Sequence, residues 1–262
     1  MLYFSYVFPR VYIITSKKMR YLTQPFVICF FFCLLAIVEG QLGCEKNWLF
    51  LVATGRSGST SLMQMLNLLP EVYIAGENAG MFQSLYDLYN KRNYTTYIKG
   101  RHKKGTQHAW WGKKVNNTRL DELMRKYTEA VIGRNSLNES PYSWIGFKEI
   151  RFRTSGELDY LLNLFQCCKV VLNFRRNTSE QHKSSFKQNV SPHKLLQINA
   201  MMKTWAKRHS ERVFTITTEE IIPENMDRLA EWLGFPECHF SDVLHSHNGG
   251  YNLDSRKVMS CN

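Results

Sequence analysis

The sequence has few features that would divide the chain or bind a metal. Its 262 residues contain no internal repeat and no low-complexity linker, so one main domain is expected. No C-x-x-C pair with matching histidines occurs, and we therefore expect no metal site. Of seven cysteines, Cys29 and Cys33 lie in an apolar run, and the remaining five leave at least one thiol free or paired with another chain. Cys238 and Cys261 are the candidate C-terminal pair.

The chain also lacks the Gly-Lys pair with which a Walker A loop holds a triphosphate. The turn at residues 54–61 has Gly58-Ser59-Thr60 at that place, and no clear magnesium-holding acid follows a predicted strand. These absences disfavour a nucleotide-dependent kinase. Magnesium-dependent ATP binding would revive that alternative.

The same turn predicts a site for a smaller anion. Trp48–Ala53 is an apolar run typical of a buried parallel strand, and helix-starting residues and helical spacing follow it up to Pro70. A helix start aims free N–H groups and the positive end of the helix dipole at one point. The candidate binding residues are Gly55, Arg56, Ser57, Gly58, Ser59, Thr60 and Ser61, with Arg56 as the cation.

Strand and helix patterns alternate along the rest of the chain. Further strands are predicted at Val72–Ile74, Trp144–Ile150, Lys169–Phe174 and Val213–Thr217. Helices are predicted around Met81–Tyr89, Leu120–Val131 (N-cap Thr118, end near Gly133), Leu158–Phe165, Ile198–Trp205 and Met226–Leu233 (end at Gly234). Residues 91–118 have no clear period and predict a long surface insertion. The pattern predicts an α/β fold, a mostly parallel sheet flanked by helices.

The N-terminal part contains the apolar run Phe26–Val38, which carries no charge and follows basic residues. The run fits the core of a signal peptide, while counting from Tyr21 makes it long enough for a tilted signal anchor. Met19 is an alternative start. Basic residues before the run predict a lumenal or extracellular C-terminal domain. We expect a leader at residues 1–40 and a lumenal domain at 41–262.

Glycosylation sequons agree with this routing, because they are used only in the secretory pathway. They occur at Asn93, Asn116, Asn138 and Asn177. We expect a glycoprotein of the Golgi lumen, anchored as a single-pass type II membrane protein, or a secreted protein if the leader is cleaved. The sequence fixes neither leader cleavage nor the oligomeric state.

The charge balance predicts an anionic partner. The formal net charge is +12 and the pI is about 9.4, which suits a nucleotide, a sulfated glycan, an acidic peptide or nucleic acid. A nucleic-acid binder would explain the charge but not the leader, so nucleic acid is not the expected partner. Trp110, Trp111 and the lysines around them could stack on sugars and attract acidic groups, or these tryptophans could form the core of a folded insertion.

Two further charged segments follow predicted strands, and ligands gather at the carboxyl ends of parallel strands. One is Lys148-Glu149-Ile150-Arg151, in which Glu149 or Arg151 could simply pair with Lys148. The other begins at Arg175-Arg176 and continues to Ser184. With the 54–61 turn, this makes three such segments at one edge of the sheet.

These segments resemble the sulfotransferases that use 3′-phosphoadenosine 5′-phosphosulfate (PAPS). Gly55–Leu62 is similar to their 5′-phosphosulfate loop, and Arg176 with Ser184, eight residues later, is similar to the pair that binds the 3′-phosphate. Asn177-Thr178 stands where the family has Asp-Pro, and Arg175 is the alternative arginine. The resemblance implies a P-loop-like sulfotransferase fold, PAPS as co-substrate and no metal.

The resemblance also implies catalytic residues. Glu77 lies where the carbohydrate and tyrosyl-protein branches, the closest in motif style, have a glutamate as general base. A hydroxyl that attacks sulfur must lose its proton, which such a carboxylate can accept. Lys148 is the second catalytic candidate, as a cation for charge that develops on the transferred group. Asn248 and Tyr251 lie in a tail that resembles the family's cofactor-covering loop.

The sequence therefore predicts sulfuryl transfer from PAPS to an acceptor hydroxyl. A carbohydrate acceptor is preferred, with protein tyrosine as the alternative. A secreted basic protein that binds glycans without catalysis is the rival of another class; it predicts polysaccharide affinity that PAPS does not change.

Overall fold

The computed structural model describes residues 47–98, 117–132, 142–184, 190–244 and 258–261, and for 92–98 only the backbone. The predicted leader, Trp110, Trp111, Asn248 and Tyr251 lie outside these residues. Residues from Cys44 onward form one compact unit. No helix in the described part of the chain is both long and apolar enough to cross a membrane.

A five-stranded parallel sheet forms the centre of this unit, in the order β2-β3-β1-β4-β5. The strands are β1 (Asn47–Ala53), β2 (Val72–Ala75), β3 (Trp144–Glu149), β4 (Cys168–Phe174) and β5 (Val213–Thr217). The apolar runs of the three inner strands, β1, β3 and β4, are buried on both faces, as expected where helices cover a parallel sheet on each side. The predicted fold class is confirmed.

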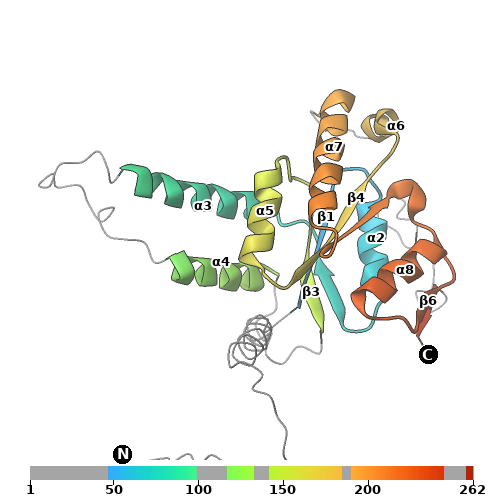
Figure 1. The fold of residues 1–262 in the computed structure, drawn as a ribbon. Coiled ribbons are helices and arrows are strands. Elements are labelled where there is room, and N and C mark those ends of the chain that lie inside the picture. Colours follow the sequence, from blue (N-terminus) through green and yellow to red (C-terminus); the bar gives the residue numbers. More distant parts are fainter. Residues whose placement is uncertain (1–46, 99–116, 133–141, 185–189, 245–257, 262) are drawn as a thin grey trace, which may run out of the picture. The chain divides into compact units, whose positions relative to one another are not determined.

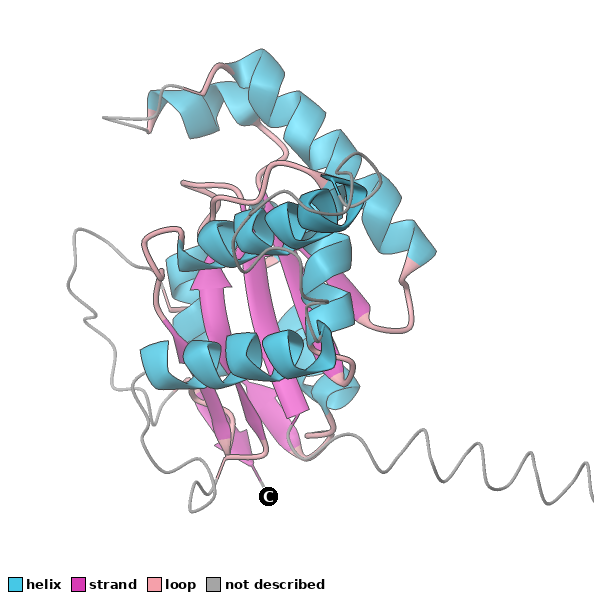
Figure 2. Ribbon diagram, turned by 90° about the vertical axis from the view of Figure 1, so that its left-hand side faces the viewer, coloured by secondary structure: helices cyan, strands magenta, loops and turns pink. Residues whose placement is uncertain are grey.

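Helices cover both faces of the sheet (Figures 1 and 2). The described α-helices are α2 (Ser59–Leu66), α3 (Met81–Ile98), α4 (Asn117–Val131), α5 (Ser155–Leu164), α6 (Thr178–Lys183), α7 (Pro192–Arg208) and α8 (Pro223–Leu233). Alternate residues of β1 point to opposite faces: Phe50 packs with residues of α5 and α7, and Leu51 with residues of α2 and α8. This central strand therefore joins two hydrophobic cores.

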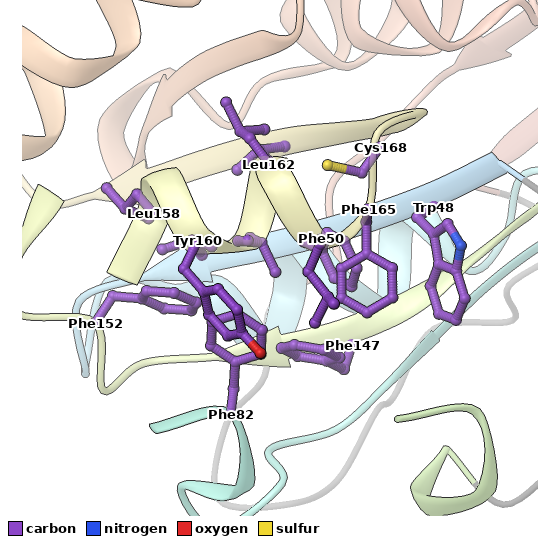
Figure 3. Close-up of a cluster of buried hydrophobic side chains, with 14 of the residues drawn as sticks. Trp48, Phe50, Phe82, Phe147, Phe152, Leu158, Tyr160, Leu162, Phe165 and Cys168 are labelled. Atoms are coloured by element: carbon purple, nitrogen blue, oxygen red, sulfur yellow. The ribbon is translucent and has the colours of Figure 1, made fainter. Parts of the chain in front are cut away.

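Aromatic side chains fill the core on the α5 face (Figure 3). The ring of Phe50 lies 4.8 Å from that of Phe147 and 4.9 Å from that of Phe165, measured between centroids. Phe82 of α3 packs against Phe147 and Tyr160. These contacts attach the start of α3 to β3 and α5, and so fix the loop that precedes α3.

A small antiparallel sheet closes the described C-terminal part. It pairs β6 (Cys238–Phe240) with β7 (Met259–Cys261), and a disulfide joins Cys238 to Cys261, as predicted. Cys167 is also disulfide-bonded, whereas Cys168 is a buried free thiol. Burial raises the pKa of Cys168 to about 11, so this thiol stays protonated at neutral pH.

Several predicted boundaries were wrong. The polar stretch after residue 90 continues α3 to Ile98, and Thr118 lies inside α4. The first helix ends at Leu66, before a turn that leads to Pro70. Helix α6 was not predicted, because Thr178–Lys183 is polar and too short to show an apolar period.

Candidate functional site

The candidate site lies at the carboxyl edge of the sheet, where the strand order reverses. From β1 the chain passes through α2 to β2, beyond β3, whereas β4 and β5 lie on the other side of β1. In open parallel sheets, ligands bind at such a reversal, outside the carboxyl ends of the strands. The 54–61 loop follows β1 and Arg175-Arg176 follow β4, so both predicted anion-binding segments flank this point.

The 54–61 loop has the backbone that an anion site needs. Arg56 and Gly58 have left-handed φ angles of 64° and 71°, and Gly58 is the residue before α2. The amide N–H groups at the start of α2 have no carbonyl partner within the helix, so the loop presents donors and the positive end of the helix dipole. The Arg56 side chain is exposed beside them.

Side chains from three other segments fix this loop. The buried Ser57 hydroxyl donates to Asn173 Oδ1 of β4 at 2.6 Å. Gln181 Nε2 of α6 donates to Thr54 Oγ1 at 2.9 Å and to the Gly55 carbonyl at 2.6 Å. Thr218 Oγ1 donates to the Ser57 carbonyl at 2.6 Å. With its hydroxyl engaged by Asn173, Ser57 can offer an anion its main chain only.

Two predicted catalytic residues meet beside the loop. Lys148 Nζ, at the end of β3, donates to Thr60 Oγ1 at 3.1 Å and lies 3.0 Å from Glu77 Oε1. Its side chain is 6% exposed, whereas that of Glu77 is 33% exposed. The buried ammonium therefore connects the predicted sulfate loop to the predicted base.

A second cation lies on the other side of Glu77. Arg151 Nη2 is 3.6 Å from Glu77 Oε2, and Arg151 Nη1 is 2.8 Å from Glu149 Oε1. The expectation that Lys148 could simply pair with Glu149 or Arg151 was wrong: its carboxylate partner in the structure is Glu77. Gly80, with a φ of 86°, lets the Glu77 loop turn close to Arg151.

The other predicted anion segment is engaged by acids. The guanidinium of Arg176 pairs with Glu220. The main-chain N–H of Arg176 donates to Glu219 Oε2 at 3.1 Å. Arg175 Nε lies 3.9 Å from Glu219 Oε1. Both acids belong to a 3₁₀ turn, η3 (Thr218–Glu220), which follows β5. A phosphate at Arg176 must therefore displace or adjoin a carboxylate.

Ser184 lies at the C-terminal end of α6. Its hydroxyl donates to the Gln181 carbonyl at 2.9 Å. Asn177 caps the start of the same helix by accepting from the Glu180 amide at 3.0 Å. Asn177 thus has a structural use where the family pattern has aspartate.

Sequence reasoning missed the residues that join the two segments: Asn173, Gln181, Thr218, Glu219 and Glu220. Asn173 carried a usable signal, because it is a polar residue inside the apolar strand sequence VVLNF. A buried amide needs hydrogen-bond partners, and Ser57 and the Ile216 carbonyl supply them. The others lie in polar segments that resemble ordinary surface loops.

Comparison with known families decides the class of protein. The model of the sulfotransferase family matches residues 49–237. The chain belongs to the sulfotransferase family. The matched span contains the loop, Glu77, Lys148, Arg176 and Ser184. The comparison with curated protein sequences gives no match.

Among solved structures, this sulfotransferase is similar to the sulfotransferase domain from the curacin biosynthetic pathway, with 14% identity, a TM-score of 0.43, and 72% of this chain and 74% of that chain covered. It is also similar to a sulfotransferase from Alicyclobacillus acidocaldarius, with 15% identity, a TM-score of 0.41, and 73% and 81% covered. A sugar kinase from Janibacter matches with 12% identity and a TM-score of 0.37. The match covers 72% of this chain and 95% of the kinase chain. The family assignment rests on the family model.

Among the described residues, no group of three or more His, Cys, Asp and Glu side chains is arranged to hold a metal ion. The described side-chain cations at this edge include Arg56, Lys148, Arg151, Arg175 and Arg176.

Proposed function

We propose that this sulfotransferase transfers the sulfuryl group of PAPS to an acceptor hydroxyl, on a carbohydrate or, as the second candidate, on a protein tyrosine. The observation that carries the proposal is the position of Lys148. Its ammonium contacts both Thr60, in the anion loop, and Glu77, the candidate base. A transferred group held by the loop would therefore lie beside the carboxylate that receives the acceptor proton.

The loop residues fit the 5′ end of PAPS. Main-chain N–H groups at the start of α2 and the Arg56 guanidinium would bind its phosphosulfate oxygens. Gly58 is suited to its place because a side chain there would be strained at φ 71° and would lie 3.1 Å from Thr218 Cγ2. Arg176, or its neighbour Arg175, and Ser184 would hold the 3′-phosphate.

The chemistry follows from the placement of charges. PAPS supplies an activated sulfuryl group whose bridging oxygen leaves with the phosphate as the acceptor oxygen bonds to sulfur. Glu77 takes the proton of the attacking hydroxyl, and its partly exposed side chain leaves room for an acceptor. Lys148 donates to oxygens that gain negative charge, a role that buried and pre-oriented donors perform well.

The acceptor and the compartment rest on sequence features. The predicted leader, the sequons and the Cys238–Cys261 disulfide together support a lumenal domain at residues 41–262 behind a leader at 1–40, in the Golgi or secreted. Acceptors that pass through this compartment include glycans and protein tyrosines. The net charge of +12 favours acidic members of either group.

Binding of the reaction product tests the proposal directly. Calorimetry on the lumenal domain should detect binding of 3′-phosphoadenosine 5′-phosphate (PAP). In a second assay, the protein should transfer labelled sulfate from PAPS to chondroitin or heparan polysaccharides or to an acidic tyrosine peptide. Absence of PAP binding would refute PAPS dependence. Polysaccharide affinity without PAP binding or transfer would identify the glycan-binding alternative, and magnesium-dependent ATP binding would identify a kinase.

A further inference from the structure

Glu149 is a buried carboxylate for which the mechanism above has no use. It ends β3, directly after Lys148, and its side chain has no exposed surface. Carboxylates are rarely buried in full unless they are paired and hydrogen-bonded, because removal from water disfavours the charged form. Its contacts therefore show what the burial serves.

Three donors converge on one oxygen of Glu149. Oε1 accepts from the amide of Ile150 at 2.8 Å, from the amide of Arg151 at 3.1 Å and from Arg151 Nη1 at 2.8 Å. Glu149 thus holds both the main chain and the side chain of Arg151. Because the main-chain N–H and Nη1 of Arg151 both donate to the same carboxylate oxygen, the direction of the guanidinium is restricted.

The guanidinium continues from Glu149 to the candidate base. Nη2 of Arg151 lies 3.6 Å from Glu77 Oε2, while Lys148 holds Glu77 Oε1 at 3.0 Å. A continuous chain of charged groups therefore runs from Glu149 through Arg151 and Glu77 to Lys148, which donates to the Thr60 hydroxyl of the loop. Each oxygen of Glu77 faces a different cation, and this sets the direction of the carboxylate.

The segment after Glu149 is itself anchored, so Arg151 starts from a fixed backbone. Arg153 Nη1 donates to the carbonyls of Ile150 at 2.8 Å and Phe152 at 3.0 Å. Thr154 and Glu157 form a capping box at the start of α5, and Glu157 also accepts from the Arg153 amide at 2.6 Å.

We infer that Glu149 is a positioning residue for sulfuryl transfer, which acts through Arg151 to hold the Glu77 carboxylate toward the anion loop. This inference rests on the proposed function. Glu149 does not need to touch either substrate. It differs from a purely structural ion pair in one respect: its loss should slow the chemical step without weakening cofactor binding.

The test compares Glu149→Gln with wild type, using labelled PAPS and the polysaccharides or tyrosine peptide above. Glutamine keeps an accepting oxygen but loses the negative charge that holds the guanidinium, so kcat should fall about 10- to 100-fold, the range known for groups that orient metal ligands. Affinity for PAP should stay within about twofold, because the loop contacts are unchanged. Asp227→Asn is the matched control: it removes a hydrogen-bonded carboxylate beside β6 and should leave kcat unchanged.

A double-mutant cycle separates action through Arg151 from a general effect. Arg151→Met should lower kcat by a similar factor, and adding Glu149→Gln to it should cause little further loss. Arg151→Lys should restore part of the rate. Independent, multiplying losses would overturn the inference.

The remaining outcomes are also decisive. Wild-type kcat in Glu149→Gln, or parallel losses of kcat, PAP affinity and melting temperature, would overturn the positioning role. If Glu149→Gln does not fold, the partly exposed Arg151 provides the test through Arg151→Met, and an unchanged kcat there refutes the inference. Wild-type protein that neither binds PAP nor transfers sulfate would instead be a failure of the proposed function.

Discussion

The two halves of the candidate site are held by different kinds of contact. Around the 54–61 loop, buried side chains such as Ser57 and Gln181 hydrogen-bond to neighbouring strands and loops. On the other half, Arg176 is 58% exposed and faces Glu220, which is 38% exposed. The first half is held by buried hydrogen bonds, whereas in the second half Arg176 is paired with a carboxylate that a bound phosphate would displace or adjoin.

This difference predicts that substitutions in the two halves will affect different quantities, kcat in the first half and cofactor affinity in the second. Pre-oriented groups beside the loop need no rearrangement at the moment of reaction, so changes there should lower kcat. Exposed ion pairs contribute little and are readily exchanged, so changes at the arginines should alter cofactor binding. Five predictions test this division, from the largest expected effect to the smallest.

Glu77→Gln should lower kcat by about 10²- to 10⁴-fold, because the acceptor proton loses its base. PAP affinity should stay near wild type by calorimetry, since Glu77 contacts cations rather than the loop. Glu122→Gln, on the exposed face of α4, is the control for loss of one carboxylate. Wild-type turnover in Glu77→Gln would remove Glu77 from the base role.

Lys148→Met should lower kcat by about 10²- to 10³-fold, as expected when one charge-stabilising donor is lost. Methionine keeps the length and packing of the buried side chain, and PAP lacks the sulfuryl group that Lys148 would face. Steady-state rates and PAP titration measure both effects, with Lys126→Met as the control. A large loss of PAP affinity at unchanged kcat would show that Lys148 serves cofactor binding and not the chemical step.

Arg176→Ala should weaken PAP binding by about 10- to 100-fold, the usual cost of a lost charged hydrogen bond. The kcat at saturating PAPS should change much less. Arg175→Ala is the direct comparison: whichever substitution causes the larger loss identifies the 3′-phosphate arginine. Equal and negligible effects would contradict the assignment of this segment.

Glu220→Gln should tighten PAP binding by about two- to fivefold, because an exposed ion pair no longer competes with the phosphate. Adenosine 5′-phosphosulfate, which has no 3′-phosphate, is the matched ligand and should bind equally well to both proteins. Weaker PAP binding in Glu220→Gln would mean that Glu220 orients Arg176 instead of competing for it.

The Arg176–Glu220 ion pair should also make the stability of the protein depend on pH. The hydrogen bond from the Thr217 amide, together with Arg176, holds the pKa of Glu220 below its usual value. A lowered folded-state pKa contributes stability above the unfolded value, and that contribution is lost as the pH falls below 4.5. Wild type should therefore exceed Glu220→Gln in stability by about 0.5 kcal/mol or less near neutral pH. If thermal melts show the same stability difference between wild type and Glu220→Gln at acidic pH as at neutral pH, this prediction is contradicted.

The sheet was predictable because its strands are short apolar runs. Lys169–Phe174 and Val213–Thr217 were found nearly to the residue, because both runs are short and rich in β-branched and aromatic residues. Polar helices gave no such signal. Residues 91–98 and α6 were missed because neither segment shows an apolar period in the sequence.

The sequence predicted which charged segments lie at one edge of the sheet, but not how their side chains pair. The rule that ligands gather at strand ends brought the loop, Lys148 and Arg176 to one edge. It could not show that Lys148 would contact Glu77, 71 residues away, because that contact depends on how the loop before α3 turns at Gly80. Glu219 and Glu220 were overlooked because they lie in a polar segment after β5 that resembles an ordinary surface loop.

The disulfide at the C-terminus gives the tail a topology that a hydrogen-bonded sheet alone would not. Cys238 and Cys261 are 23 residues apart, and a covalent ring of that size removes about 3 kcal/mol of chain entropy from the unfolded protein. Asn248 and Tyr251 belong to this ring by their place in the sequence. A single backbone cut between the two cysteines would therefore leave both fragments attached, and only cleavage combined with reduction would release the tail.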